Sequence, residues 1–244
     1  REREIQHFEA TSSYRVRATF VVTDEKGKPV ELKADLSERL KTKEEAIAFL
    51  EKCKDAKFVV ENVEKKPLKR YPAAPFTTST LQQEVARKLG YSVSQTMSIA
   101  QKLYESGKIT YMRTDSVNLS NLALNAAREE ICTIMGEKYH HTRYYQTKSK
   151  GAQEAHEAIR PTSTFKDPAS VKGFLSRDQF RLYKLIWERF VSSQMAPAIL
   201  DTMSVDLENN GVVFRANGSK VKFPGFMKVY VEGTDDTVEE KDHI

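Results

Sequence analysis

Residues 80–107 read TLQQEVARKLGYSVSQTMSIAQKLYESG, and this stretch predicts two short helices joined by a tight turn. Thr80 and Gln83 have the spacing of a capping box, so we expect the first helix to begin there and to end at Gly90. Ser92 is placed to cap the second helix. Two short helices with a tight turn are typical of a helix-turn-helix. The middle of the chain is therefore expected to be helical.

Further elements are predicted after this helix pair. Residues 109–113 are expected to form a short strand, and apolar residues then recur at about 3.6-residue spacing over residues 119–134, which predicts a third helix. Ser176 and Gln179 form another capping box and predict a fourth helix. Trp187 lies on the apolar stripe of that helix, so we expect it in the core.

The two ends of the chain are predicted to be β-structure. Apolar and polar residues alternate, as in half-buried strands, at residues 14–22, 31–36 and 202–207. Strands are also predicted at residues 57–63, 212–216 and 221–223. A capping box predicts one helix, over residues 43–54, among them. We therefore expect an α+β fold. In it, residues 1–70 and 197–244 form a discontinuous antiparallel β domain, into which residues 71–196 are inserted as a mainly helical domain with a helix-turn-helix.

The composition excludes several classes of protein. The 244 residues are 30% charged and 39% hydrophobic, and no apolar run approaches the roughly 18 residues that a membrane span needs, so no membrane partner is expected. Cys53 and Cys132 are the only cysteines and form no CxxC pair, which excludes zinc fingers and favours a reducing compartment. Because the sequence starts without Met and has no signal-peptide pattern, we expect a piece of a longer cytoplasmic protein.

The formal net charge of +5 is carried by the middle of the chain. Residues 71–196 hold 17 Lys and Arg against 11 Asp and Glu, whereas the flanks hold 22 against 23. A basic excess in one domain suits a polyanionic partner, although such an excess is also common on solvated surfaces.

Familiar nucleotide and metal motifs are missing from the sequence. It contains no G-x-x-x-x-G-K-[ST], so no P-loop is expected. His156-Glu157 begins like the H-E-x-x-H motif of zinc proteases, but Arg160 stands where the second His is required. The sequence has no Asp-x-Asp cluster, so no metal site is expected in this chain.

The segment ITYMRTDS, residues 109–116, contains the pattern Tyr111-x-Arg113. In an extended strand these two side chains share a face. A guanidinium there would favour the phenolate form of Tyr111 and could clamp a phosphodiester oxygen with paired hydrogen bonds. A phenolate attacking phosphorus would conserve the bond energy in a phosphotyrosine, so resealing would need no nucleotide. The same spacing also occurs in ordinary strands with Tyr in the core and Arg in water, so spacing alone leaves both interpretations open.

Three stretches carry a resemblance to a known family: APFTTSTLQQ at residues 74–83, LYESGKITYMRTDS at residues 103–116 and QEAHEAIRPT at residues 153–162. In this order they resemble bacterial DNA topoisomerase I, a type IA topoisomerase, and the resemblance extends over nearly the whole chain. It implies that Tyr111 attacks a phosphodiester of single-stranded DNA to form a 5′-phosphotyrosine. It also implies that Arg113 contacts DNA and stabilises the transition state. His156 is implied to bind the strand near the scissile phosphate, and Arg160 is expected close to phosphate.

The resemblance also implies the architecture and the cofactors of the whole enzyme. Members of the family are toroids, and the expected fold corresponds to the arch, which opens a gate in the cut strand. Strand passage then relaxes negatively supercoiled DNA without ATP. The Toprim domain with its acidic Mg²⁺ cluster and the base domain are absent from this sequence, so the Mg²⁺ ligands are expected outside it. We expect that the chain alone cannot relax DNA, and that the full enzyme is a monomer in the bacterial cytoplasm, associated with the nucleoid.

One other class of function remains open from the residues alone, a helix-turn-helix DNA-binding protein in which Tyr111 is structural. For a protein of that class we expect Tyr111 in the core and a dense basic face on residues 92–106. The enzyme instead requires Tyr111, Arg113 and His156 to reach one surface. The basic run at residues 65–70 could be a linker or could line a DNA cavity.

Overall fold

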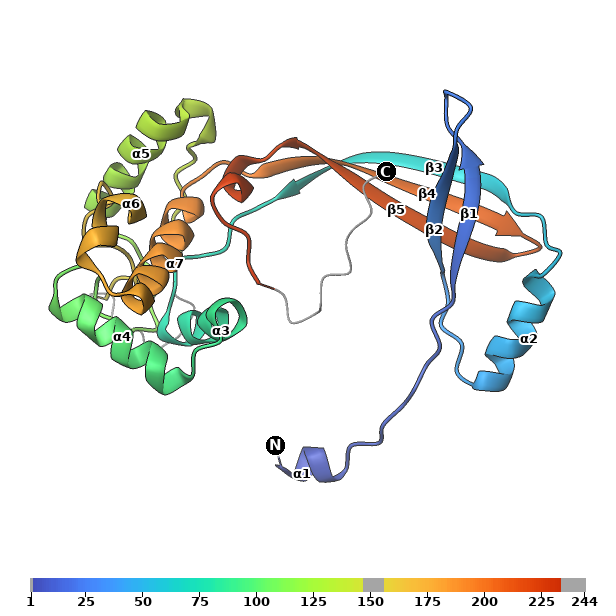
Figure 1. Ribbon diagram of the computed structural model, residues 1–244, viewed down its shortest axis with the longest axis horizontal. Coiled ribbons are helices and arrows are strands. Elements are labelled where there is room, and N and C mark those ends of the chain that lie inside the picture. The colour runs from blue at the N-terminus through green and yellow to red at the C-terminus, as the bar shows by residue number, and fades with distance from the viewer. Residues whose placement is uncertain (1, 147–155, 234–244) are drawn as a thin grey trace. The chain divides into compact units, whose positions relative to one another are not determined.

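The computed structural model describes residues 2–146 and 156–233, which form two compact units (Figure 1). Of these residues, the first unit contains those up to Pro67 together with Asp201–Lys220. The second unit contains Leu68–Leu200 and the segment from Val221 to residue 233. Each unit has a hydrophobic core of its own.

A five-stranded sheet with strand order β1-β2-β5-β4-β3 builds the β-structure. Its strands are β1 (Arg17–Thr23), β2 (Pro29–Leu36), β3 (Val59–Arg70), β4 (Ala198–Asn209) and β5 (Val212–Phe223). The β1–β2 hairpin is antiparallel, with Phe20 opposite Leu32, and β2 pairs antiparallel with β5 through Asp35 and Arg215. The predicted α+β class, with an antiparallel sheet built from both ends of the chain, is therefore confirmed.

Partly buried aromatic rings pack around Phe214 in the core of the first unit. The ring of Phe214 on β5 meets the rings of Phe20 and Phe58 edge to face, with centroids 5.8 and 5.4 Å apart. The unit also contains α1 (Glu2–Gln6) and α2 (Lys43–Cys53). The hydroxyl of Thr42 caps α2, as predicted, by accepting from the backbone of Glu45.

The second unit is mainly helical. Its α-helices are α3 (Thr78–Leu89), α4 (Val93–Glu105), α5 (Asn121–Met135), α6 (Pro168–Val171) and α7 (Arg177–Ser193), and its 3₁₀ turns are η1 (Glu137–Tyr139), η2 (Lys172–Phe174) and η3 (Gly225–Lys228). Helix α7 contacts α3, α4 and α6 (Figure 1). The side chains of Leu182, Ile186 and Phe190 are fully buried, so α7 is the centre of this core. Trp187 is buried beside them, as predicted.

Two local predictions are wrong. Helix α3 begins at Thr78, because Thr77 is its N-cap and the capping box joins Thr77 to Thr80 rather than Thr80 to Gln83. The strand predicted at residues 109–113 is an irregular loop in which Ile109 alone makes a β-bridge. The caps at Ser92 and Ser176 are confirmed, since each hydroxyl accepts from the backbone three residues later.

The predicted β domain extended too far at its C-terminal end. Of its residues 197–244, those from Val221 to residue 233 belong to the helical unit, because Phe226 and Tyr230 are buried in the core of that unit. The basic run at residues 65–70, for which a linker was one possibility, is the C-terminal half of β3. No helix in the described part of the chain is long and apolar enough to cross a membrane.

Candidate active site

The loop between α4 and α5 presents Tyr111 and Arg113 to solvent. Ile109 and Met112 are buried and anchor the loop, whereas Tyr111 is 43% exposed and Arg113 is exposed. A helix-turn-helix protein with a structural tyrosine was expected to bury Tyr111 and to carry a dense basic face. Helix α4 has Lys102 as its one cation, so both observations argue against that alternative.

Arg113 and His156 meet at one open pocket, although 42 residues separate them in the sequence. The pocket has a volume of about 640 Å³, and its lining also includes Thr77, Thr78, Ser79, Thr114 and Asp115. The first three of these are the N-cap and first turn of α3. The helix dipole favours negative charge there, while the backbone N–H groups of Thr77 and Thr78 already donate to the hydroxyl of Thr80 and the carbonyl of Thr114. The structure therefore brings two of the predicted residues together in surroundings that suit a phosphate. Tyr111 does not line this pocket itself.

Tyr104 is a neighbour of Tyr111 that the sequence did not single out. It lies on α4 and is 41% exposed. Its ring meets the ring of Tyr111 edge to face, with centroids 5.2 Å apart. Aromatic pairs favour this geometry, so Tyr104 restricts where the phenol of Tyr111 can point.

Arg160 lies beside the pocket-lining residues and bonds to its own segment of the chain. Its side chain is 11% exposed and is not among those that line the pocket. The guanidinium donates to a carboxylate oxygen of Glu157 at 2.6 Å and to the carbonyl of Pro161 at 2.9 Å. Arg160 thus holds the segment that follows His156 and does not offer its charge to the pocket.

Glu157 joins this segment to α5. Its carboxylate accepts from the backbone of Ser120, the N-cap of α5, at 2.7 Å. Burial would raise the pKa of Glu157, but the hydrogen bonds from Ser120 and Arg160 outweigh burial and hold this pKa below its ordinary value. A charged Glu157 is therefore part of the scaffold under the site.

Comparison with known proteins identifies the family of the chain. A family model described as DNA topoisomerase matches residues 1–243. The chain belongs to the DNA topoisomerase family. It is also similar to the structure of full-length topoisomerase I from Thermotoga maritima, with 36% sequence identity and a TM-score of 0.73. The match covers 99% of this chain and 40% of that one. The resemblance drawn from the three motifs is thus confirmed.

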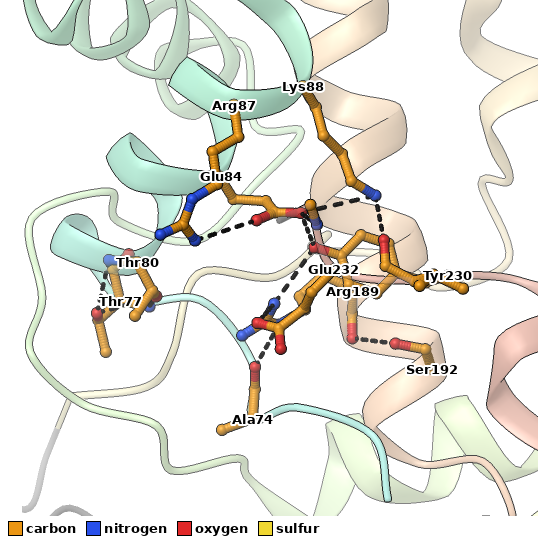
Figure 2. Close-up of polar contacts among 12 residues, drawn as sticks. Ala74, Thr77, Thr80, Glu84, Arg87, Lys88, Arg189, Ser192, Tyr230 and Glu232 are labelled. Atoms are coloured by element: carbon orange, nitrogen blue, oxygen red, sulfur yellow. Dashed lines mark hydrogen bonds and ion pairs between the residues drawn. The ribbon is translucent and has the colours of Figure 1, made fainter. Parts of the chain in front are cut away.

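A buried ionic network supports the N-terminal side of the candidate site (Figure 2). Arg189 of α7 is 5% exposed, and its Nε donates to the carbonyl of Ala74 at 2.6 Å. Its Nη1 donates to Tyr230 at 3.2 Å and to Glu232 at 2.7 Å. Because Ala74 lies three residues before the N-cap of α3, Arg189 fixes the chain as it enters the pocket-lining turn.

Glu84 of α3 is the acidic centre of the same network, with 2% of its surface exposed. It accepts at 2.7 Å from both the hydroxyl of Tyr230 and the backbone of Gly233. The ammonium of Lys88 and the guanidinium of Arg87 lie 3.6 and 3.8 Å from its two oxygens. Burial and the bond to Glu84 raise the pKa of Tyr230. The network therefore fastens residues 230–233 to α3 (Figure 2).

The Mg²⁺ that the resemblance implies does not fit these residues. In residues 2–146 and 156–233, no group of three or more His, Cys, Asp or Glu side chains could hold a metal ion. No step of the reaction is therefore assigned to a metal bound by this chain.

Proposed function

We propose that this chain is the part of a type IA DNA topoisomerase that carries the nucleophile, and that Tyr111 is that nucleophile. The observation that carries the proposal is the exposure of Tyr111 and Arg113 on one loop, with Arg113 and His156 lining one pocket. Membership of the DNA topoisomerase family supports it. The matched solved chain is much longer than this one, so the activity of the whole protein is part of the proposal.

The proposed chemistry is a reversible transfer of one phosphoryl group. The oxygen of Tyr111 forms a bond to phosphorus in single-stranded DNA, the bond from phosphorus to the 3′ oxygen breaks, and that oxygen leaves as a 3′ hydroxyl. The phenol gives up a proton and the leaving 3′ oxygen gains one, so protons balance. The reverse attack by the 3′ hydroxyl restores the phosphodiester and the free phenol of Tyr111. The cation of Arg113 stabilises the charge on the phosphoryl oxygens, and His156 binds the strand beside them. No ATP is consumed, because the phosphotyrosine conserves the energy of the broken bond.

The rest of the cycle belongs to parts of the enzyme outside this chain. We propose that a Toprim domain holds Mg²⁺ and supplies acid and base groups, that a base domain binds most of the strand, and that the present chain forms the arch. The substrate is a single-stranded segment of negatively supercoiled DNA, and the monomeric enzyme acts in the bacterial cytoplasm at the nucleoid. Without those domains the chain is proposed to be inactive in relaxation.

The test is to trap the covalent intermediate. The protein extended by its Toprim and base domains is incubated with a single-stranded oligonucleotide labelled at its 3′ end, because the 3′ fragment stays attached to the enzyme. Denaturing electrophoresis should show a labelled adduct with the unsubstituted protein and with Tyr144→Phe, a control at a tyrosine that is also exposed. Tyr111→Phe should form no adduct while its affinity for the oligonucleotide, measured by fluorescence anisotropy, is kept. An adduct of normal yield with Tyr111→Phe would overturn the proposal.

A further inference from the structure

Thr78, the first residue of α3, makes an unusual set of bonds to the active-site loop. Its backbone N–H donates to the carbonyl of Thr114 at 2.9 Å. Its hydroxyl donates to the carbonyl of Met112 at 2.7 Å and accepts from the backbone of Thr114 at 2.9 Å. One threonine thus binds the residues on both sides of Arg113.

Thr110 repeats this arrangement on the other side of Tyr111. Its backbone N–H donates to the carbonyl of Arg160 at 2.9 Å. Its hydroxyl donates to the carbonyl of Ala158 at 2.7 Å and accepts from the backbone of Arg160 at 2.9 Å. The two threonines use the same atoms in the same order, and each binds two residues that are two positions apart. We call each of these sets of three hydrogen bonds a threonine clip.

The two clips close a ring of three chain segments. Thr78 joins the first segment to the loop, and Thr110 joins the loop to the segment that follows His156. The ring is completed where the backbone of Ile159 donates to the carbonyl of Phe76 at 2.8 Å. Each segment comes from a different one of the three topoisomerase-like motifs, so the clips connect residues that are far apart in the sequence.

We infer that Thr78 and Thr110 are positioning residues, whose hydroxyls orient Tyr111 and Arg113 for attack on the phosphodiester. This inference rests on the proposed function, since it assigns the clips to the same reaction. Tyr111 is the one residue between the two clipped stretches of the loop. The loop has no regular ladder of backbone hydrogen bonds, and the clips replace that ladder. They leave the outward face of the loop open to DNA.

The physical reason is that an attacking group must be held close to its productive geometry. A misplacement of about 1 Å can lower the rate of reaction about 100-fold. Valine has nearly the shape of threonine but can neither donate nor accept. It therefore removes two of the three bonds of a clip and leaves part-buried carbonyl and N–H groups without that partner. Serine keeps the hydroxyl. The Thr→Val and Thr→Ser pair therefore separates hydrogen bonding from shape.

The experiment compares Thr78→Val and Thr110→Val with their Ser counterparts in the extended protein. The control is Thr162→Val, which loses a single bond, from its hydroxyl to the carbonyl of Gly107. At saturating oligonucleotide, each clip Val variant should form the Tyr111 adduct about 10- to 100-fold more slowly, with an oligonucleotide Kd within about threefold of normal. The Ser variants and Thr162→Val should stay close to the unsubstituted rate. Val variants that fold and react at the normal rate would overturn the inference. Ser variants whose rate of adduct formation falls as far as that of the Val variants would overturn it too.

A second measurement separates this inference from the proposed function. Hydrogen exchange of the backbone amides of Thr114 and Arg160 should be strongly slowed in the unsubstituted protein and faster, by about tenfold or more, in the matching Val variant. If the unsubstituted protein forms no adduct at all, the proposed function fails. The existence of the clips is then decided by exchange alone, and unchanged exchange in the Val variants would refute them. A Val variant that does not fold is replaced by the Thr→Ala variant at the same position, which also lacks the hydroxyl, and the Ser variant remains its comparison in both measurements.

Discussion

The rings of Tyr104 and Tyr111 meet edge to face, with an angle of 64° between their planes. Both rings are partly exposed, so this contact does little to bury apolar surface. Its main consequence is geometric, because it restricts the directions in which the phenol of Tyr111 can turn. Helix α4, which carries Tyr104, is itself held in the core by Leu103 and Ala100.

Replacing Tyr104 should therefore affect the reaction more than the stability. We expect Tyr104→Ala to lower the rate of adduct formation several-fold and the free energy of unfolding by less than about 1.5 kcal/mol, the upper value for an aromatic pair. Tyr104→Phe keeps the ring and serves as the matched control, with a rate near normal. The two measurements are single-turnover cleavage and urea unfolding. A Tyr104→Ala protein that cleaves as fast as Tyr104→Phe would show that the ring contact has no role in the reaction.

Breaking the buried network of Figure 2 should cost much more stability. Arg189→Met leaves the carbonyl of Ala74 without its donor. It also removes the donor to Tyr230, whose hydroxyl bonds to the buried Glu84. Removing one partner from a buried ionic group typically costs about 3–5 kcal/mol. Because Glu232 is half-exposed, we expect a loss of about 3 kcal/mol in the free energy of unfolding, measured with urea.

The control for Arg189 lies on the same helix. Lys184 is half-exposed, and its ammonium is 3.7 Å from Glu188. Glu188 is partly buried and Lys184 reaches solvent. Ion pairs at the surface contribute up to about 1 kcal/mol, so Lys184→Met should change the stability by about 1 kcal/mol or less. Equal unfolding midpoints for Arg189→Met and Lys184→Met would show that the buried network stabilises the fold no more than a surface ion pair does.

The sequence predicted the larger elements of this protein well, and the reasons are local. Helix α7 and its cap at Ser176 follow from a capping box and an apolar stripe that lie within a few residues of each other. The spacing Tyr111-x-Arg113 was also recognised locally, although the predicted strand is a loop and the spacing alone left the exposure of Tyr111 open. Patterns of this kind can be recognised in a single sequence because spacing alone determines which side chains share a face.

What the sequence did not reveal depends on contacts between distant residues. The loop at residues 109–113 has the alternation of a strand, but the hydroxyls of Thr78 and Thr110 take over the bonds that a neighbouring strand would make. Their partners lie 34 and 48 residues away, and no spacing rule links them. The ion pair of Arg160 with Glu157 was likewise not predicted from the sequence.

The ion pair between Glu157 and Arg160 should make stability depend on pH. The pKa of Glu157 is lower in the folded protein than its ordinary value of 4.5. A carboxyl with a depressed pKa contributes stability that is fully present above its unfolded pKa and is lost as the pH falls through its folded pKa. Glu157→Gln should therefore be less stable than the unsubstituted protein at pH 7, and the difference should shrink as the pH falls below 4.5.

Urea unfolding of both proteins from pH 7 down to pH 3 gives this difference directly. Glu129→Gln is the control, because Glu129 lies on the exposed face of α5, and its effect should be small at every pH. A difference for Glu157→Gln that stays constant across the range would show that the amide and the carboxylate are equivalent at this position.

Gly225 should tolerate no side chain, because it lies where the segment after β5 returns to the helical unit. Its φ of +50° is in the left-handed region, and an added Cβ would overlap the carbonyl oxygens of Ala196 and Pro197. Strain of this kind costs about 1–3 kcal/mol before the overlap is counted, so we expect Gly225→Ala to lower the free energy of unfolding by about 3 kcal/mol. Gly173→Ala is the matched control, because nothing lies within 4 Å of its Cβ position and its φ is not positive. Phe226 follows directly and is buried in the core, so the backbone at Gly225 positions a core side chain. Wild-type stability in Gly225→Ala would show that the fold does not depend on this backbone conformation.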